Sequence, residues 1–99
     1  MTPMKRKQIK VDIDAFIKSH GGDYAAFYVG VSANAKRRLF NEHQVARKGA
    51  YTRRRAFTAD KAREVEQHFL NKGCEGDTGG GEDTADRIYA YKMTAATDP

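Results

Sequence analysis

Residues 27–39, FYVGVSANAKRRL, contain the clearest change of local structure in this 99-residue chain. The first residues are apolar and end near Gly30, as in a short sheet strand. The following ones begin with small polar turn formers and continue as a basic helix. An aromatic hydroxyl at the end of a strand and a guanidinium just inside the next helix are suited to binding a phosphate. We therefore work outward from this strand–turn–helix unit.

The strand of this unit is expected over residues 23–31, where the side chains alternate between two faces. Tyr24 and Tyr28 fall on the same face, so they either line one groove together or pack against a helix. Gly30, near the end of the strand, allows a close backbone approach or a bulge. The strand thus offers two candidate phenol groups.

The helix of the unit is expected to begin at Ser32 or Asn34, either of which can cap it, and to run to about residue 47. On a helical wheel, Arg38 lies at the edge of the apolar arc, where a long side chain can bury its stem and direct its charge into a cleft. Arg37 points away from that arc and is the better candidate for a solvent-exposed charge. Arg38 is therefore the candidate site residue of this helix.

Before this unit, we expect a helix over residues 12–20 that Asp12 caps and Gly21 terminates. His20 at its C-terminus suits the helix dipole better than a catalytic role. Residues 1–8 are rich in Lys and Arg and are expected to form a loose basic arm or the approach to the first element.

After the unit, residues 48–57, KGAYTRRRAF, are expected to form a basic loop in which Tyr51 accompanies Arg53, Arg54 and Arg55. Arginines interleaved with aromatics suit a nucleic-acid backbone, through ion pairs with phosphates and stacking on bases. A solvated loop anchored by its aromatic residues would have the same sequence, and the two interpretations remain equally open.

Residues 59–71 have the clearest helical pattern in the chain, with Thr58 as the N-cap and Gly73 at the end. On the wheel, Glu66 falls inside the apolar stripe and Glu64 on the opposite side. A carboxylate on an apolar face is costly unless it is paired or binds a cation. Glu66 is therefore either the partner of an internal arginine such as Arg38 or a metal ligand.

The C-terminal part begins with a Gly-rich acidic stretch, residues 73–86, expected to be a mobile connection. Residues 87–93, RIYAYKM, alternate again and are expected to form a strand beside residues 24–31 in an antiparallel sheet. Together these patterns predict one α+β domain of residues 1–99, with a core of about 9–94, a tail at 95–99, and a small antiparallel sheet packed with about three helices.

The composition narrows the classes of function. Eighteen Lys and Arg against thirteen Asp and Glu give a net charge of +5, which is compatible with a polyanionic partner. The single cysteine, Cys74, excludes an intramolecular disulfide and a cysteine-based zinc site. No apolar run reaches ten residues, so we expect no membrane span and no secretory signal, and a cytoplasmic location.

Three motifs together resemble the GIY-YIG nuclease domain of homing endonucleases, some restriction enzymes and the incision subunit of bacterial nucleotide excision repair. The second half of its signature appears here as Tyr28-Val29-Gly30, and Arg38 stands ten residues beyond Tyr28, where the family has its arginine. The family's glutamate pattern appears as Ala62-Arg63-Glu64-Val65-Glu66, which selects Glu66. The family's first strand, with Gly-Ile-Tyr, is absent ahead of Tyr28; the nearest look-alike is Gly22-Asp23-Tyr24.

The resemblance implies a site with one divalent ion, Mg²⁺ or Mn²⁺, on Glu66. It also implies a water activated by a tyrosine, Tyr28 or Tyr24, or by His43. Arg38 would stabilise the charge that develops on the phosphate. Nucleic-acid contacts would come from the exposed basic residues and one aromatic: Lys36, Arg37, Arg53, Arg54, Arg55 and Tyr51.

The function expected on these grounds is a small metal-dependent endonuclease that hydrolyses DNA phosphodiester bonds, with RNA as an alternative substrate. Loops, oligomerisation or a protein partner would supply specificity, because 99 residues leave no room for a separate recognition domain. The alternative is a non-catalytic nucleic-acid-binding or protein-interaction domain on the same scaffold, with Glu66 and Arg38 paired as structural residues.

Overall fold

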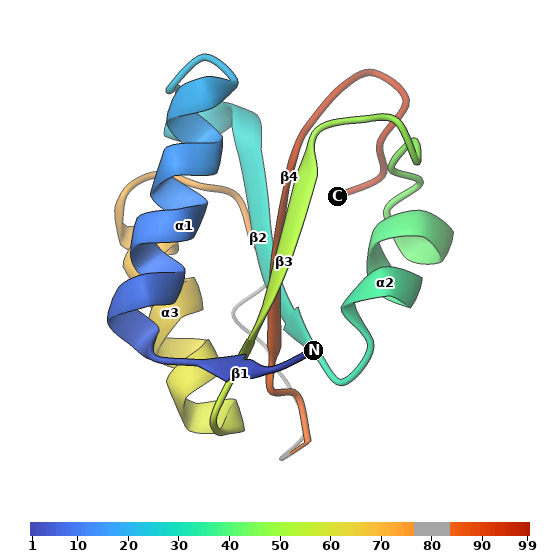
Figure 1. The fold of residues 1–99 in the computed structure, drawn as a ribbon. Coiled ribbons are helices and arrows are strands. Elements are labelled where there is room, and N and C mark those ends of the chain that lie inside the picture. The colour runs from blue at the N-terminus through green and yellow to red at the C-terminus, as the bar shows by residue number, and fades with distance from the viewer. Residues whose placement is uncertain (77–83) are drawn as a thin grey trace.

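The computed structural model describes residues 1–76 and 84–99. A sheet stands between two layers of helix (Figure 1). In chain order the elements are β1 (Pro3–Met4), α1 (Arg6–Ser19), β2 (Phe27–Ser32), α2 (Ala35–Arg37), β3 (Tyr51–Ala56), α3 (Ala59–Asn71) and β4 (Arg87–Lys92). The α+β class expected from the sequence is confirmed.

The sheet has the strand order β1-β3-β4-β2. The strand expected over residues 87–93 is confirmed as β4, which pairs antiparallel with β2 and places Gly30 opposite Tyr89. On its other side β4 pairs antiparallel with β3, and the two-residue strand β1 adds a parallel pairing to β3. The sheet is therefore mixed, with its antiparallel part as predicted.

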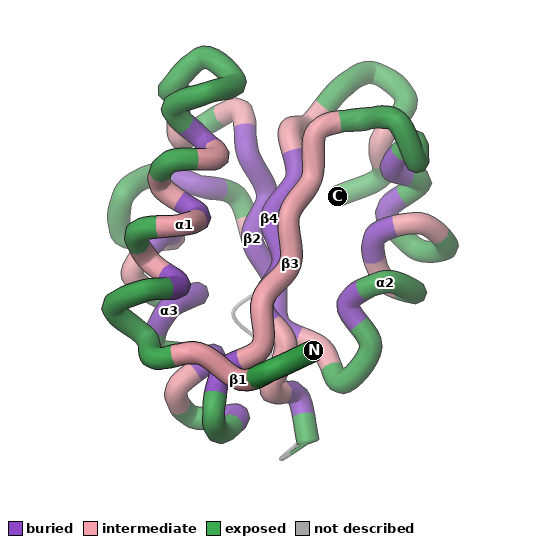
Figure 2. Tube along the Cα trace, viewed as in Figure 1, coloured by how far each residue is buried: buried purple, intermediate pink, exposed green. Residues whose placement is uncertain are grey.

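Helices α1 and α3 cover one face of the sheet, and α2 covers the other (Figure 1). The face under α1 and α3 carries the larger apolar core, to which α1 contributes Ile9, Ile13 and Ile17, all fully buried. These isoleucines recur every four residues, which places them on one side of a helix. Figure 2 shows β2 and β4 as the most continuously buried strands, whereas β3 is of intermediate burial along most of its length.

Two N-terminal predictions were wrong. Helix α1 begins at Arg6, so the expected basic arm is β1 and the first turn of α1, and Lys5 occupies the N-cap position. Asp12 lies within the helix, and its Oδ2 accepts a hydrogen bond from Arg54 Nε on β3 at 3.2 Å. Burial of Ile9 against the sheet extends the helix by more than a turn beyond the expected start.

The elements around the central unit are shorter than expected. Residues Tyr24–Ala26 form a turn of 3-10 helix, so β2 begins only at Phe27, and Tyr24 does not share a strand face with Tyr28. After α2 the chain widens into a π-helical turn, Arg38–Glu42, closed by the His43 N–H to Arg38 carbonyl bond of 2.8 Å. The expected helix to residue 47 is therefore wrong beyond residue 42.

The expected basic loop over residues 48–57 is also wrong for most of its length. Residues Tyr51–Ala56 form β3, because their backbone groups pair with β4 on one side and β1 on the other. Helix α3 has the predicted bounds, and the Thr58 hydroxyl accepts the N–H of Lys61 at 3.2 Å.

The connection expected to be mobile over residues 73–86 lies partly outside the described residues, at 77–83. Where it is described, it is ordered. The Val29 N–H donates to the Glu75 carbonyl and the Glu75 N–H to the Phe27 carbonyl, both at 2.9 Å. This segment covers the outer edge of β2, which is one of the two edge strands of the sheet.

Candidate functional site

Under α2, three tyrosines of the sheet pack around His43, which follows the π-helical turn: Tyr28, Tyr89 and Tyr91, here called with His43 the tyrosine–histidine cluster. The ring of Tyr28 lies 4.6 Å from His43 and 5.3 Å from Tyr91, measured between centroids. Tyr89 and Tyr91 are fully buried, and only 4% of His43 and 6% of Tyr28 is exposed. The cluster is thus a buried polar group of residues inside an apolar layer.

Hydrogen bonds define the protonation state of His43. Its Nδ1 lies 2.8 Å from the backbone carbonyl of Asp98, which can only accept, so Nδ1 carries the hydrogen. Its Nε2 therefore has no hydrogen and accepts a hydrogen bond from the Tyr89 hydroxyl at 2.8 Å. Burial lowers the pKa of His43, and the positive charge of Arg38 lowers it further, against the opposing effect of the Asp98 carbonyl. His43 is therefore neutral at pH 7 and uses both ring nitrogens within the cluster.

The phenols of β4 are held in their protonated form. Burial raises the pKa of Tyr89 and of Tyr91 well above the usual range. For Tyr89, the Arg38 charge acts in the opposite direction, while Tyr28, Tyr91 and the Glu66 carboxylate raise the pKa. Tyr89 therefore keeps its proton and can donate it to His43 Nε2.

Gly30 makes room for this arrangement. A Cβ at Gly30 would come within 2.5 Å of Cζ in the Tyr89 ring. The glycine of the Tyr-Val-Gly motif is therefore required by the tyrosine of the neighbouring strand, which lies across it.

Arg38 lies at the start of the π-helical turn. Its side chain is half-buried, as the helical wheel suggested. Its side chain is 33% exposed, against 64% for Arg37, and its ion pair is with Glu42, Nε to Oε2 at 3.4 Å. Arg38 Nε itself is shielded from solvent and has no hydrogen-bond acceptor in the described part of the chain. Among the described residues, the ion pair of Arg38 is thus with Glu42 and not with Glu66, the internal partner weighed from the sequence.

Glu66 faces inward from α3, as predicted, with 7% of its surface exposed, while Glu64 is exposed and pairs with Arg6. Mg²⁺ is commonly held by one or two protein carboxylates completed by water and substrate phosphate. One buried carboxylate fits that donor set. Among residues 1–76 and 84–99, no group of three or more His, Cys, Asp or Glu side chains is placed to hold a metal ion.

Tyr24 does not join the cluster. It packs against the other core, its hydroxyl donates to Asp14, and the ammonium of Lys72 lies 5.3 Å from its ring centroid. His20, assigned a structural role from the sequence, is the C-cap residue of α1, and its Nδ1 lies 2.9 Å from the carbonyl of Phe16.

The arginines expected in one basic loop are divided between the two faces of β3. Arg54 points to α1, where it meets Asp12, and Arg55 pairs with Asp86 at 3.0 Å on the opposite face. Tyr51 packs edge-on against Phe40, at 5.0 Å between centroids. Lys36 and Arg37 remain exposed on α2. Arg54 therefore lies apart from the strand face that Tyr51, Arg53 and Arg55 share.

Sequence reasoning missed Tyr89 and Tyr91 as site residues. The signal was present, because the alternation in RIYAYKM places both tyrosines on one face of a strand expected beside the Tyr-Val-Gly strand. The contribution of Asp98 had no signal, since the carbonyl of any residue can accept a hydrogen bond.

In the described part of the chain, no helix has the length and apolar character needed to cross a membrane. No family model matches the sequence, and neither curated proteins nor solved structures give a match.

Proposed function

We propose that this protein is a small GIY-YIG-like, metal-dependent endonuclease that hydrolyses DNA phosphodiester bonds in the cytoplasm. The observation that carries the proposal is the position of Tyr89. Its ring lies over Gly30 of the Tyr-Val-Gly motif, its hydroxyl bonds to His43, and it stacks against Tyr28. Three residues selected by the family resemblance therefore contact a fourth that the resemblance did not select.

The strand that carries Tyr89 takes the place of the family's first strand, whose absence is the main departure from the family pattern. In the family signature the two tyrosine strands lie close together in the chain, so a short connection makes them antiparallel neighbours. Here the antiparallel neighbour of β2 is β4, and it carries Ile88-Tyr89. This supports the same two-strand arrangement with the order of the strands along the chain exchanged.

The residues divide the work as follows. Arg38, with a buried donor and a positive charge, stabilises the charge that develops on the phosphate. Glu66 would hold the divalent ion, which when bound supplies Lewis-acid stabilisation of the phosphoryl oxygens. His43 already accepts from Tyr89 and donates to Asp98, so it positions the cluster. Tyr28, the member of the cluster with the largest exposed fraction, is left as the group that takes the proton from water.

The test is nicking of supercoiled plasmid in Mg²⁺ or Mn²⁺. We expect Glu66→Gln and Arg38→Ala each to lower the rate by about 100-fold or more, the loss typical for a removed transition-state contact. Glu64→Gln changes the exposed neighbour of Glu66 and is expected to keep a near-wild-type rate. Absence of cleavage with both metals, or equal rates in all three variants, would overturn the proposal.

The second candidate is a non-catalytic nucleic-acid-binding domain, favoured by the complete burial of Tyr89 and Tyr91. A site whose phenols never reach solvent would hold the fold rather than a substrate. Salt-dependent DNA binding without cleavage in either metal would support this candidate over the first.

A further inference from the structure

A basic pocket lies away from the tyrosine–histidine cluster, at the end of the sheet where α1 and α3 both begin. It has a volume of about 640 Å³ and is lined by five cationic side chains and one aromatic: Lys5, Arg6, Lys7, Lys10, Lys61 and Phe57. The sequence had suggested nucleic-acid contacts elsewhere, on α2 and residues 51–55. This pocket is a separate surface.

The topology of the sheet creates the pocket. Strand β1 runs parallel to β3, with Met4 opposite Ala56, and each strand passes almost directly into a helix. Helices α1 and α3 therefore start side by side, at the lower end of the sheet in Figure 1. Residues some fifty positions apart in the sequence are brought to one hollow by this parallel pairing.

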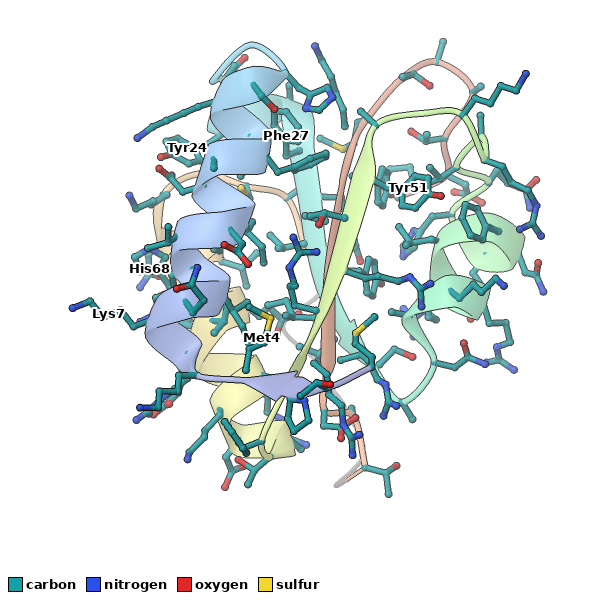
Figure 3. The ribbon with its side chains drawn as sticks, viewed as in Figure 1. Met4, Lys7, Tyr24, Phe27, Tyr51 and His68 are labelled. Carbon is teal, nitrogen blue, oxygen red and sulfur yellow. The ribbon has the colours of Figure 1, made fainter. Side chains whose placement is uncertain are left out.

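The positive charge of the pocket is largely uncompensated. Arg6 pairs with Glu64, but within residues 1–76 and 84–99 no ion pair involves Lys5, Lys7, Lys10 or Lys61. The first turn of α1 contains no acidic residue. Figure 3 shows Lys7 extending outward from α1. Four lysines directed around one hollow repel one another, and an anion seated there removes that repulsion.

Phe57 gives the pocket a second chemistry. It is 53% exposed, a large apolar side chain left at the surface beside the lysines, and Lys61 Nζ lies 5.6 Å from its ring centroid. An exposed aromatic ring between cationic side chains is the combination that binds single-stranded nucleic acid, because a base stacks on the ring while lysines contact the phosphates. In a duplex, the bases are already stacked on one another and do not offer a free face.

We propose that this pocket binds a segment of single-stranded nucleic acid, with one base stacked on Phe57 and the adjoining phosphates held by Lys5, Lys7, Lys10 and Lys61. The inference stands on the pocket alone and does not depend on cleavage at the other site. It gives the protein a second contact for a nucleic-acid strand, on the α1–α3 side of the sheet.

The experiment is fluorescence anisotropy with a labelled oligothymidylate of about ten nucleotides, in EDTA, with a duplex of equal length in parallel. We expect Phe57→Leu to weaken binding of the single strand about tenfold and to leave duplex binding within about twofold. Phe57→Tyr, which keeps the ring, should bind like the wild type. The exposure of Phe57 means that the variants remain folded, which circular dichroism verifies.

Charge reversal tests the phosphate contacts. Lys7→Glu combined with Lys10→Glu should lower affinity more than tenfold and make the dependence of log affinity on log salt shallower by about 0.7 for each lost contact. Lys48→Glu, an exposed lysine between α2 and β3, is the matched control and should have a smaller effect.

Three results would overturn the inference. The first is a single-strand affinity in Phe57→Leu and in the lysine variant that equals that of the wild type, or a loss of affinity in Phe57→Leu that is the same for single strand and duplex. The second is competition by thymidine monophosphate as effective as that by the oligonucleotide, which would indicate a mononucleotide pocket. The third is binding to anionic phospholipid vesicles, with no oligonucleotide binding, through the same lysines. Because EDTA prevents metal-dependent cleavage, a failed nicking assay does not affect any of these results.

Discussion

Gly30 illustrates how a single residue depends on the neighbouring strand. Nothing in its local conformation requires glycine, since its backbone is not in the left-handed region. The requirement comes from the Tyr89 ring, which occupies the space of a Cβ and is held by the bond from its hydroxyl to His43. A residue that looks like a backbone feature in the sequence is thus a packing feature in the structure.

We predict that Gly30→Ala destabilises the protein by about 1–3 kcal/mol, the usual cost of inserting a methyl group into a packed interior. Chemical denaturation followed by circular dichroism measures the change. In a Tyr89→Val background the same substitution should cost much less, because the obstructing ring is absent. Equal costs in the two backgrounds would mean that the ring is not the obstacle.

His43 should make stability depend on pH. Burial lowers its pKa below the usual value of 6.5, so the unfolded state binds more protons than the folded state just below pH 6.5. Stability therefore falls as the pH drops through 6.5 and stops falling below the folded-state pKa. His43→Gln should flatten this slope and, by removing buried hydrogen bonds, cost about 1–3 kcal/mol at pH 7.

The pH profile of the free energy of unfolding measures this effect. His68, whose pKa is also lowered by burial and by Lys10 and Lys72, leaves a residual slope in the His43 variant. His20→Gln, at an exposed position, is the matched control and should keep the wild-type profile. An unchanged slope in His43→Gln would show that His43 is not the group responsible.

At the scale of elements, local capping residues set the bounds of one helix, and tertiary packing sets those of another. Helix α3 follows its own sequence, with Thr58 at the start and a glycine at φ +111°, Gly73, after the end. Helix α1 extends toward its N-terminus because Ile9 packs against the sheet, and no side chain caps it. Regular α-helix ends at Arg37 in the α2 segment. The π-helical turn that follows places His43 within hydrogen-bond distance of Tyr89 on β4.

Thr58→Ala should lower stability by about 1 kcal/mol through loss of the hydrogen bond from the Lys61 N–H. Thr58→Ser retains the hydroxyl and is expected to lose little. Thermal or urea denaturation distinguishes the two variants. If serine and alanine are equally destabilising, the cap does not contribute through its oxygen.

At the scale of the whole molecule, Cys74 reports on opening of the fold. It is 7% exposed, and burial raises the pKa of its thiol to about 11, so the reactive thiolate is scarce at pH 8. We expect iodoacetamide to label it far more slowly in the native protein than in denaturant, at a rate that follows the population of opened molecules. The measurement is mass spectrometry over time at several urea concentrations, and equal rates with and without denaturant would contradict the burial.

The fold could be predicted wherever the pattern along one segment matched the environment of that segment. The alternation in RIYAYKM and the helical stripe of residues 59–71 were sufficient for β4 and α3. The three arginines of β3 were assigned to a loop because charged residues rarely fill a strand. They are tolerated there because Arg54 and Arg55 have carboxylate partners, Asp12 and Asp86, on opposite faces. Those partners are distant in the sequence and could not be foreseen.

The candidate site could be predicted only in part, because some of its residues depend on the pattern of one segment and others on contacts between segments. Sequence alone determined the inward position of Glu66, the half-buried position of Arg38 and the strand that carries Tyr28, since each depends on the periodicity of one element. Only the tertiary structure decided that Tyr89 packs beside Tyr28, that Tyr24 lies in the other core, and that Lys5, Lys7 and Lys10 meet Phe57 in one pocket. These outcomes depend on which strands pair. Strand pairing is set by the total free energy of packing both faces of the sheet, and no single segment contains that information.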